Sequence, residues 1–485
     1  MELTEVNYQQ SKLHPALIWR WLGFGLVAGF IIGYWVQLPW AVAFTAGLIA
    51  AAAAYFNIGP RLATLFIVGC LAALWRGNGL LPAPVANSWL GEQEFIARIV
   101  ELPRLGDRVT RYVVQPLTES QRYRVLIVAS PWPEFAYGDI LRFSCQTVEA
   151  VTFRPYTDRG IWRSCAFPEV KLVNKNSSGL RYWLYRAREA AGNRIRELAP
   201  EPYATLATGM LWGDDSGLPT ALVQAFRRTG TTHLLAVSGF NVMVLTQVLF
   251  LVFIYLGCWR RQASIAVLLL TALFVIFSGA EPSVMRAGAM GSILLVGQLL
   301  ARKPDELNVL VGTAAVMLLI TPRLVAELGW QLSFAAMVGL TYISPRLNKK
   351  LVWLPNFLSL RESAAATLAA TLATTPVILI SLGQLSTITP LANLAVAPVV
   401  VLVYWFGLSL LVLSPVGLIA ATPAVWLLTA VLFYLTTVVT WLASLPWAAV
   451  TASGLTWAAA VVFYVGMGWW LIAPAQLIKR KRKLL

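Results

Sequence analysis

Long apolar segments separated by short polar turns make up most of this chain. Most of them are long enough to cross a hydrocarbon core of ~30 Å as a helix. The pattern predicts twelve spans, at residues 16–36, 40–56, 62–75, 234–256, 263–278, 284–300, 307–320, 324–343, 364–382, 391–413, 424–442 and 455–472. The shortest, such as 307–320, would also suit a re-entrant or broken helix.

Between the third and fourth spans the pattern changes to short stretches that alternate polar and apolar residues. They read EFIARIVEL, RVTRYVVQPL, YRVLIVAS, DILRFSCQTVEA and, last, a stretch near AFPEVKLV, with a turn marked by Tyr137, Gly138 and Asp139. Such alternation is typical of strands with one buried face. Five short strands within residues 88–175 predict a small closed β-barrel of OB-like type.

The many aromatic residues and arginines of this predicted barrel allow two interpretations. They could stack on and attract a single-stranded nucleic acid. Alternatively, the aromatic rings form the barrel core and the arginines a solvated face. The sequence leaves both open.

Two amphipathic helices are predicted after the barrel. Apolar residues recur at three- and four-residue steps over 180–198, with arginines elsewhere on the helix, and a second element covers 219–228. This pattern indicates helices that lie on the membrane surface. The predicted domains are therefore N-terminal transmembrane helices (1–87), an extracytoplasmic OB-like domain (88–175), interfacial helices (176–232) and a long transmembrane domain (233–485).

Composition agrees with a polytopic α-helical membrane protein: the chain is 58% hydrophobic and 12% charged, with a mean hydropathy of +0.68. The net charge of +16 lies mostly in short loops and in the KRKRK tail, whereas the predicted barrel is nearly balanced. Lysine and arginine collect on the cytoplasmic side of membrane proteins. Their positions predict a multi-pass protein of the cytoplasmic (inner) membrane with both termini inside and the barrel outside.

The four cysteines are too few for a disulfide scaffold. Cys70 and Cys258 lie in or beside apolar spans, where a free buried thiol is expected. Cys145 and Cys165 both lie in the barrel segment. A disulfide between them is expected if that segment faces an oxidising exterior, and is not expected if it faces the cytoplasm.

Polar residues interrupt the spans in four places, although a charge at the centre of a membrane helix costs about 2.5–3.5 kcal/mol. Glycines and prolines nearby indicate broken or closely packed helices around a cavity. Together they predict a polar path through the helices. The members are His233, Ser238 and Asn241; Glu281, Ser283 and Arg286; Glu327, Gln331 and Ser333; and Thr374, Thr375, Ser381, Gln384 and Asn393.

Glu281 and Arg286 are five residues apart across Pro282, which suits two helix ends that meet in a turn. Opposite charges there could neutralise each other. A structural ion pair and a role in the polar path are equally good interpretations.

Features of an enzyme are few. His233 and Ser238, five residues apart, would point to different faces of one continuous helix, and no carboxylate lies near the histidine to orient it. With two histidines in the chain and no C-x-x-C motif, no metal site is expected. No P-loop is present either, so we expect no cofactor and no intrinsic source of transport energy.

Three motifs in order resemble the ComEC family, the inner-membrane channel for DNA in natural transformation. They are GMLWGDDSGLPTALVQAFRRTGTTHLLAVSGFNV, FSGAEPSVMRAGAM and ELGWQLSFAAMVGL. The order of spans, barrel and long membrane domain also resembles this family. The resemblance covers most of residues 16–413. It implies a competence-type channel domain that passes single-stranded DNA, with a DNA receptor outside and an ATPase or helicase in the cytoplasm.

The resemblance also implies which residues line or shape such a channel. Matching positions are Gly213, Asp214, His233, Ser238, Gly239, Ser283, Arg286, Gln331 and Ser333. Asn241 departs from many relatives, which have a second histidine there; an amide hydrogen-bonds but is no general base. Many relatives also continue into a metallo-β-lactamase-like domain, whereas this chain stops at KRKRKLL, so we expect a separate nuclease.

The leading hypothesis is therefore a channel that translocates single-stranded DNA. One alternative is a membrane-embedded hydrolase or transferase that uses His233 and Ser238. Another is a transporter of a different polymer or of lipid. Composition and spacing alone predict no more than a polytopic transporter or channel.

Overall fold

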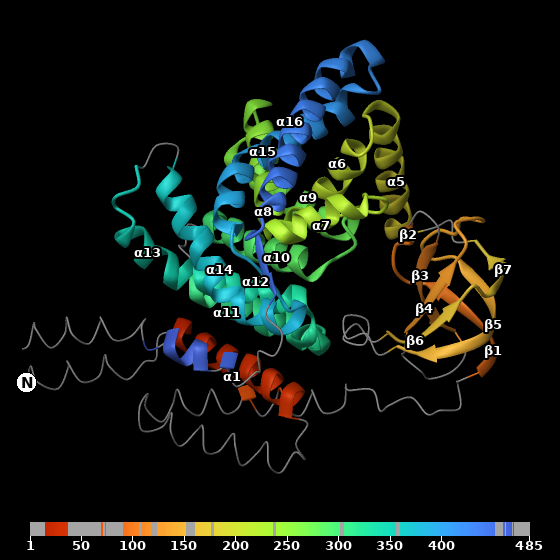
Figure 1. Ribbon diagram of the computed structural model, residues 1–485, viewed down its shortest axis with the longest axis horizontal. Helices are drawn as coiled ribbons and strands as arrows, with labels where there is room; N and C mark the ends of the chain where they lie inside the picture. The colour runs from red at the N-terminus through yellow and green to blue at the C-terminus, as the bar shows by residue number, and fades with distance from the viewer. Residues whose placement is uncertain are drawn as a thin grey trace, which may run out of the picture.

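The computed structural model describes residues 15–36, 69–70, 73, 91–105, 109–117, 124–151, 161–175, 179–235, 239–300, 305–355, 359–451, 459–460, 462–467 and 469. The predicted spans 40–56 and 455–472 lie wholly or mostly outside these residues, as does most of 62–75. A β-barrel lies at one side of a larger helical part (Figure 1). The protein is thus a largely helical molecule with one barrel domain.

Five strands close the barrel: β1 (Gly91–Ile99), β3 (Thr110–Pro116), β4 (Arg124–Ala129), β5 (Ile140–Ala150) and β6 (Ile161–Ala166). Their pairing runs β1-β3-β4-β6-β5 and returns from β5 to β1, with β4 and β6 parallel and the other pairs antiparallel. A short strand, β2 (Arg104–Leu105), pairs with β3. The closed five-stranded barrel predicted from the alternating stretches is confirmed.

The strand that closes the barrel is not the one expected. The last predicted strand, near AFPEVKLV, corresponds to β7 (Glu169–Asn174), which pairs only with β5 and is largely exposed. Closure comes from β6, just before it. The sequence IWRSCA lacks the polar and apolar alternation that predicts a strand, because a charged residue, Arg163, occupies a buried position at 3% exposure.

The barrel core contains three of the aromatic residues that suggested nucleic-acid stacking. Phe95, Tyr112 and Phe143 are buried with Ile127 and Leu141. Burial raises the pKa of the Tyr112 phenol. Trp132 and Phe167 are exceptions, with 73% and 65% of their surfaces exposed. The interpretation of these three rings as core residues is the one that fits the structure.

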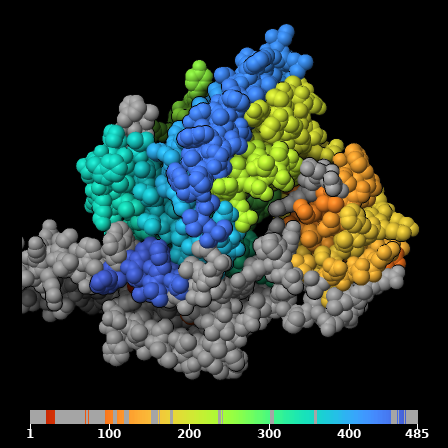
Figure 2. Space-filling model, viewed as in Figure 1, coloured from red at the N-terminus to blue at the C-terminus, as the bar shows by residue number. Residues whose placement is uncertain are grey.

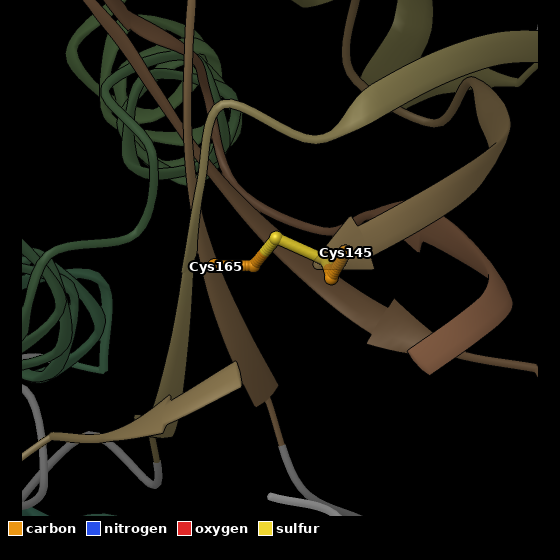
Figure 3. The surroundings of a disulfide bond; sticks show 2 residues. All are labelled: Cys145 and Cys165. Atoms are coloured by element: carbon orange, nitrogen blue, oxygen red, sulfur yellow. A yellow bond between two sulfur atoms is a disulfide. The ribbon is translucent and has the colours of Figure 1, made fainter. Parts of the chain in front are cut away.

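Cys145 on β5 and Cys165 on β6 form a disulfide inside the barrel (Figure 3). Their Cα atoms are 6.1 Å apart, and both residues are almost fully buried. The bond joins the strand that closes the barrel to its antiparallel neighbour. Disulfides of this kind persist in oxidising compartments.

The helix α5 (Leu180–Leu198) starts at the barrel. The ring of Tyr137, in the barrel turn, lies 4.5 Å from that of Tyr185, and Arg181 Nη1 donates to Tyr137 Oη at 3.5 Å. Farther along α5, Arg188 donates to the carbonyl of Phe277 at 3.2 Å, and Arg194 to that of Ser414 at 3.2 Å. This helix therefore connects the barrel to two other helix ends.

Within the described residues, four helices are long and apolar enough to cross a membrane: α9 (Arg260–Phe277), α14 (Leu360–Leu382), α15 (Thr389–Leu413) and α16 (Leu418–Ser444). Shorter apolar helical stretches cover Arg20–Ile31, Val242–Tyr255 and Glu306–Ile320. The number of twelve spans stays a prediction.

The remaining helices follow the predicted segments with shifted ends. They are α1 (Pro15–Val36), α7 (Thr220–Thr229), α8 (Gly239–Tyr255), α10 (Pro282–Leu299) and α11 (Glu306–Ile320). The predicted helix 234–256 begins later than expected, because residues 232–234 form a 3-10 turn, η3. The predicted helix 324–343 is broken: it consists of a 3-10 turn, η4 (Pro322–Ala326), then α12 (Leu328–Val338) and a π-helical turn, η5 (Gly339–Ile343), and leads into α13 (Ser344–Lys350).

A short helix absent from the sequence prediction, α6 (Tyr203–Trp212), lies in the largest buried cluster. Its residues 204–212 are all buried, and Tyr404 Oη of α15 donates to its Met210 carbonyl at 2.7 Å. Helices α7, α15 and α16 contribute to the same cluster. In Figure 2 the surface of α7 adjoins the long blue surface of α16, with which it is in contact.

Candidate functional site

The central motif forms a tight polar turn between α7 and α8. Helix α7 ends at Gly230, which has a left-handed φ of 71°. The hydroxyl oxygens of Thr229 and Thr231 are 2.7 Å apart and buried. His233 is exposed, and its Nδ1 lies 3.2 Å from the carbonyl of Gly230. The histidine thus contacts its own turn.

Two residues singled out beside His233 cannot be placed by their side chains. Ser238 lies outside the described residues, and Asn241 is in α8 with its side chain outside them. A pairing of His233 with Ser238 stays a hypothesis.

Gly239, the first residue of α8, packs directly against Arg286 of α10. A Cβ atom at Gly239 would lie 2.6 Å from Arg286 Nη2 and 3.4 Å from the Cβ of Ala287. Only glycine permits such an approach. Farther along the two helices, Val242 and Val284 form a small apolar cluster. Arg286 therefore lies beside the central motif at Gly239.

Arg286 is 7% exposed, and among the described residues its Nε has no hydrogen-bond partner. Its Cζ lies 6.0 Å from the ring centre of Phe334 on α12, within the range of a cation–π interaction. The site therefore combines the start of α8, a buried cation from α10 and an aromatic ring from α12.

Phe334 is the member of this site that the sequence did not reveal. It directly follows Ser333 in the motif QLSF, but an aromatic residue in an apolar helix is usually a packing residue. A pairing with Arg286, 48 positions earlier in the chain, depends on how α10 and α12 pack. No local pattern contains that information.

Glu281 and Ser283 occupy the start of α10. Glu281 is the N-cap residue, with its carbonyl accepting from Met285 N at 2.9 Å, and Ser283 follows Pro282 in the first turn. Both are partly buried. The ion pair between Glu281 and Arg286 stays a prediction.

The polar residues of the third motif lie on α12. Gln331 Nε2 donates to the carbonyl of Val325 at 2.9 Å, so this side chain fastens α12 to the turn η4. Ser333 is half-buried beside Phe334. Gln331 has a positioning role here, and no contact places it at Arg286.

The loop that holds Asp214 lies apart from Arg286, at the end of α6. Gly213 ends this helix with a left-handed φ of 78°, and Thr208 Oγ1 donates to the Asp214 carbonyl at 2.8 Å. The Asp214 carboxylate lies 3.6 Å from Arg196 of α5. The loop thus joins α6 to α5.

Within the described residues no group of three or more histidine, cysteine, aspartate or glutamate side chains could hold a metal ion. The described parts of the molecule define a helical membrane protein with a closed barrel domain and a buried arginine at a helix junction. A family model described as "Competence protein" matches residues 210–477, more than half of the chain. The chain therefore belongs to the competence protein family, a ComEC-type group.

The chain is similar to ComE operon protein 3 of Bacillus subtilis (strain 168), at 29% identity over 236 residues. The match covers 49% of this chain and 28% of that protein. No solved structure matches the chain.

Proposed function

We propose that this protein is a channel through which single-stranded DNA crosses the cytoplasmic membrane during natural transformation. Membership of the competence protein family supports a role in DNA uptake. The observation that carries the channel is Arg286, a buried cation where α8, α10 and α12 meet. A strand with a charge on every phosphate needs such cations along its path.

The disulfide supports an extracytoplasmic barrel, since it calls for an oxidising compartment. With the barrel outside and both termini inside, the proposed partners are a DNA receptor outside, a cytoplasmic ATPase or helicase, and a separate nuclease that supplies the strand. The four long apolar helices support insertion in a bilayer.

The hydrolase or transferase alternative receives no support from the described residues, where the His233 ring contacts the carbonyl of Gly230. No observation favours a transporter of lipid or of another polymer. We therefore retain the channel alone.

The test is deletion of the gene, followed by separate assays of DNA capture and DNA import. We expect transformation to be lost while labelled DNA still binds to the cell surface. Purified protein in liposomes should then admit labelled single-stranded DNA. Normal transformation in the deletion strain would reject the proposal.

A further inference from the structure

The loop between α8 and α9 is a short turn with a defined backbone. Gly257 has a left-handed φ of 86°, and its N–H donates to the carbonyl of Ile254 at 3.0 Å, while that of Cys258 donates to the carbonyl of Phe253 at 2.9 Å. These two bonds form a Schellman motif, in which a glycine ends a helix without strain. Helix α9 begins two residues later, at Arg260. The backbone of this loop therefore holds its side chains at set positions.

Three large apolar side chains at this turn are exposed. Tyr255 is 92% exposed, Leu256 70% and Trp259 80%. Apolar groups that gather on an exposed surface indicate that something covers them. Both flanking helices are apolar: α9 is long enough to cross a membrane, and Val242–Tyr255 is a shorter apolar stretch of α8. Because the loop continues these helices, we place it at the surface of the bilayer that holds them, where tyrosine and tryptophan are enriched.

Two arginines complete this surface, and no ion pair neutralises them. Arg260 and Arg261 are both exposed, and neither guanidinium has a hydrogen bond or an ion pair with a described residue. No acidic residue occurs between Asp215 and Glu281. The two arginines do not stabilise α9 either, because a cation disfavours the start of a helix. Their N–H donors are therefore available to an external anion.

We propose that Tyr255, Trp259, Arg260 and Arg261 form a binding surface for the headgroups of anionic phospholipids. The two rings lie at headgroup level, and the guanidinium groups bind lipid phosphate oxygens. The negative surface potential of an anionic leaflet adds to this attraction. Zwitterionic lipids meet the rings equally well but lack the net charge that two unpaired cations favour. This inference goes beyond the proposed function, because it needs a bilayer and not DNA.

The test uses the full-length protein with Cys70→Ala in nanodiscs, labelled at Cys258 with a fluorescent maleimide. Cys258 is free and partly exposed, and the other two cysteines form the disulfide. The nanodiscs contain a brominated phospholipid, either anionic or zwitterionic, which quenches the label at short range. We expect half-maximal quenching by the anionic lipid at a mole fraction at least about fivefold lower, the effect of one arginine near an anionic surface.

The variant Arg260→Gln with Arg261→Gln should lose this preference, while the zwitterionic lipid quenches as in the wild type. Unchanged quenching by the zwitterionic lipid also shows that the variant keeps its loop in place. Trp259→Ala should instead weaken quenching by both lipids by a similar factor, because the loop loses a ring at headgroup level. The matched control is Arg98→Gln with Arg111→Gln, which removes the same charge from two exposed positions of the barrel and should keep the preference.

Three results would overturn the proposal. The first is a wild type without a preference for the anionic lipid, and the second is an equal preference in the Arg260→Gln with Arg261→Gln variant. The third is loss of the wild-type preference when inorganic phosphate or a 12-mer of thymidine is added, because the surface would then bind free phosphate or nucleic acid. We expect neither addition to change the quenching.

Discussion

Gly230 shows how a single residue fixes the turn that precedes α8. Its φ of 71° is strained for any other residue, and an added Cβ would lie 2.0 Å from Thr389 Oγ1 and 3.1 Å from the Cβ of Ser386. The turn that holds His233 is thus pressed against the start of α15. A side chain at this position would meet both conformational strain and a clash.

We predict that Gly230→Ala destabilises the protein more than Gly383→Ala does. Both glycines end helices with similar angles, φ 71° and 64°, but nothing lies within 4 Å of a Cβ at Gly383. Gly383→Ala, the control, should lower the free energy of unfolding by about 1–2 kcal/mol through left-handed strain. Gly230→Ala should lower it by about 1–3 kcal/mol more through overpacking. Unfolding free energies of the detergent-solubilised variants check this; equal losses would contradict the packing.

At the scale of elements, the barrel depends on the bond between β5 and β6. Replacing both Cys145 and Cys165 by alanine should cost about 3 kcal/mol, given their separation of 20 residues. Limited proteolysis of the barrel, with and without reductant, measures the loss. Replacing the free cysteine Cys258 by alanine is the matched control and should change little.

Two sequence expectations cannot both hold for α5. Arg181 contacts the barrel through Tyr137, and Arg194 contacts Ser414 in the turn after α15. If α5 lies flat on one membrane surface, that turn is on the same side as the barrel. Strict alternation of twelve spans instead places the turn and the barrel on opposite sides.

Cysteine labelling decides between these arrangements. In a background with Cys70 and Cys258 replaced by alanine, Trp132→Cys in the barrel and Val416→Cys in the turn are treated with an impermeant maleimide in intact cells. Both positions are exposed, at 73% and 76%. Helix α5 is about 28 Å long at 1.5 Å per residue, close to the ~30 Å thickness of the hydrocarbon core, so it is long enough to run along the other helices from one side of the membrane to the other. We therefore expect only Trp132→Cys to react. Labelling of both would instead place α5 on the outer surface and break the alternation.

Periodic elements could be predicted from the sequence, and contacts between elements could not. The range 180–198 was predicted with the bounds that α5 has, because apolar residues recur on one face. Helix α6 was missed because it is buried on all sides and follows Pro200 and Pro202, which hide its period. The contact of Gly239 with Arg286 depends on packing between helices, which no local pattern records.

At the scale of the whole molecule, the N-terminal helix belongs to the same packed body as the family-matched region. Arg20 donates to Asn308 Oδ1 at 2.8 Å and Asp305 Oδ1 at 2.9 Å, which joins α1 to α11. A Cβ at Gly23 would lie 2.7 Å from Val311 Cγ1. Residues before position 210 therefore contribute to the core.

We predict that Gly23→Leu separates α1 from α11 and destabilises the protein by about 1–3 kcal/mol through overpacking. Thermal unfolding and protease sensitivity of the purified full-length protein measure the effect. Gly312→Leu is the matched control, because nothing lies within 4 Å of a Cβ there. If both variants behave like wild type, α1 is not seated on α11 as described.

The two short strands beside α15 and α16 have a mechanical consequence. Strand β8 (Gln384–Ser386) precedes α15 and pairs with β9 (Ala449–Thr451), which follows α16. The two helices are also joined at their other ends by the turn at 414–417. The pair is thus a closed frame, so α15 and α16 can move apart at neither end without breaking either the β8–β9 pairing or the turn at 414–417.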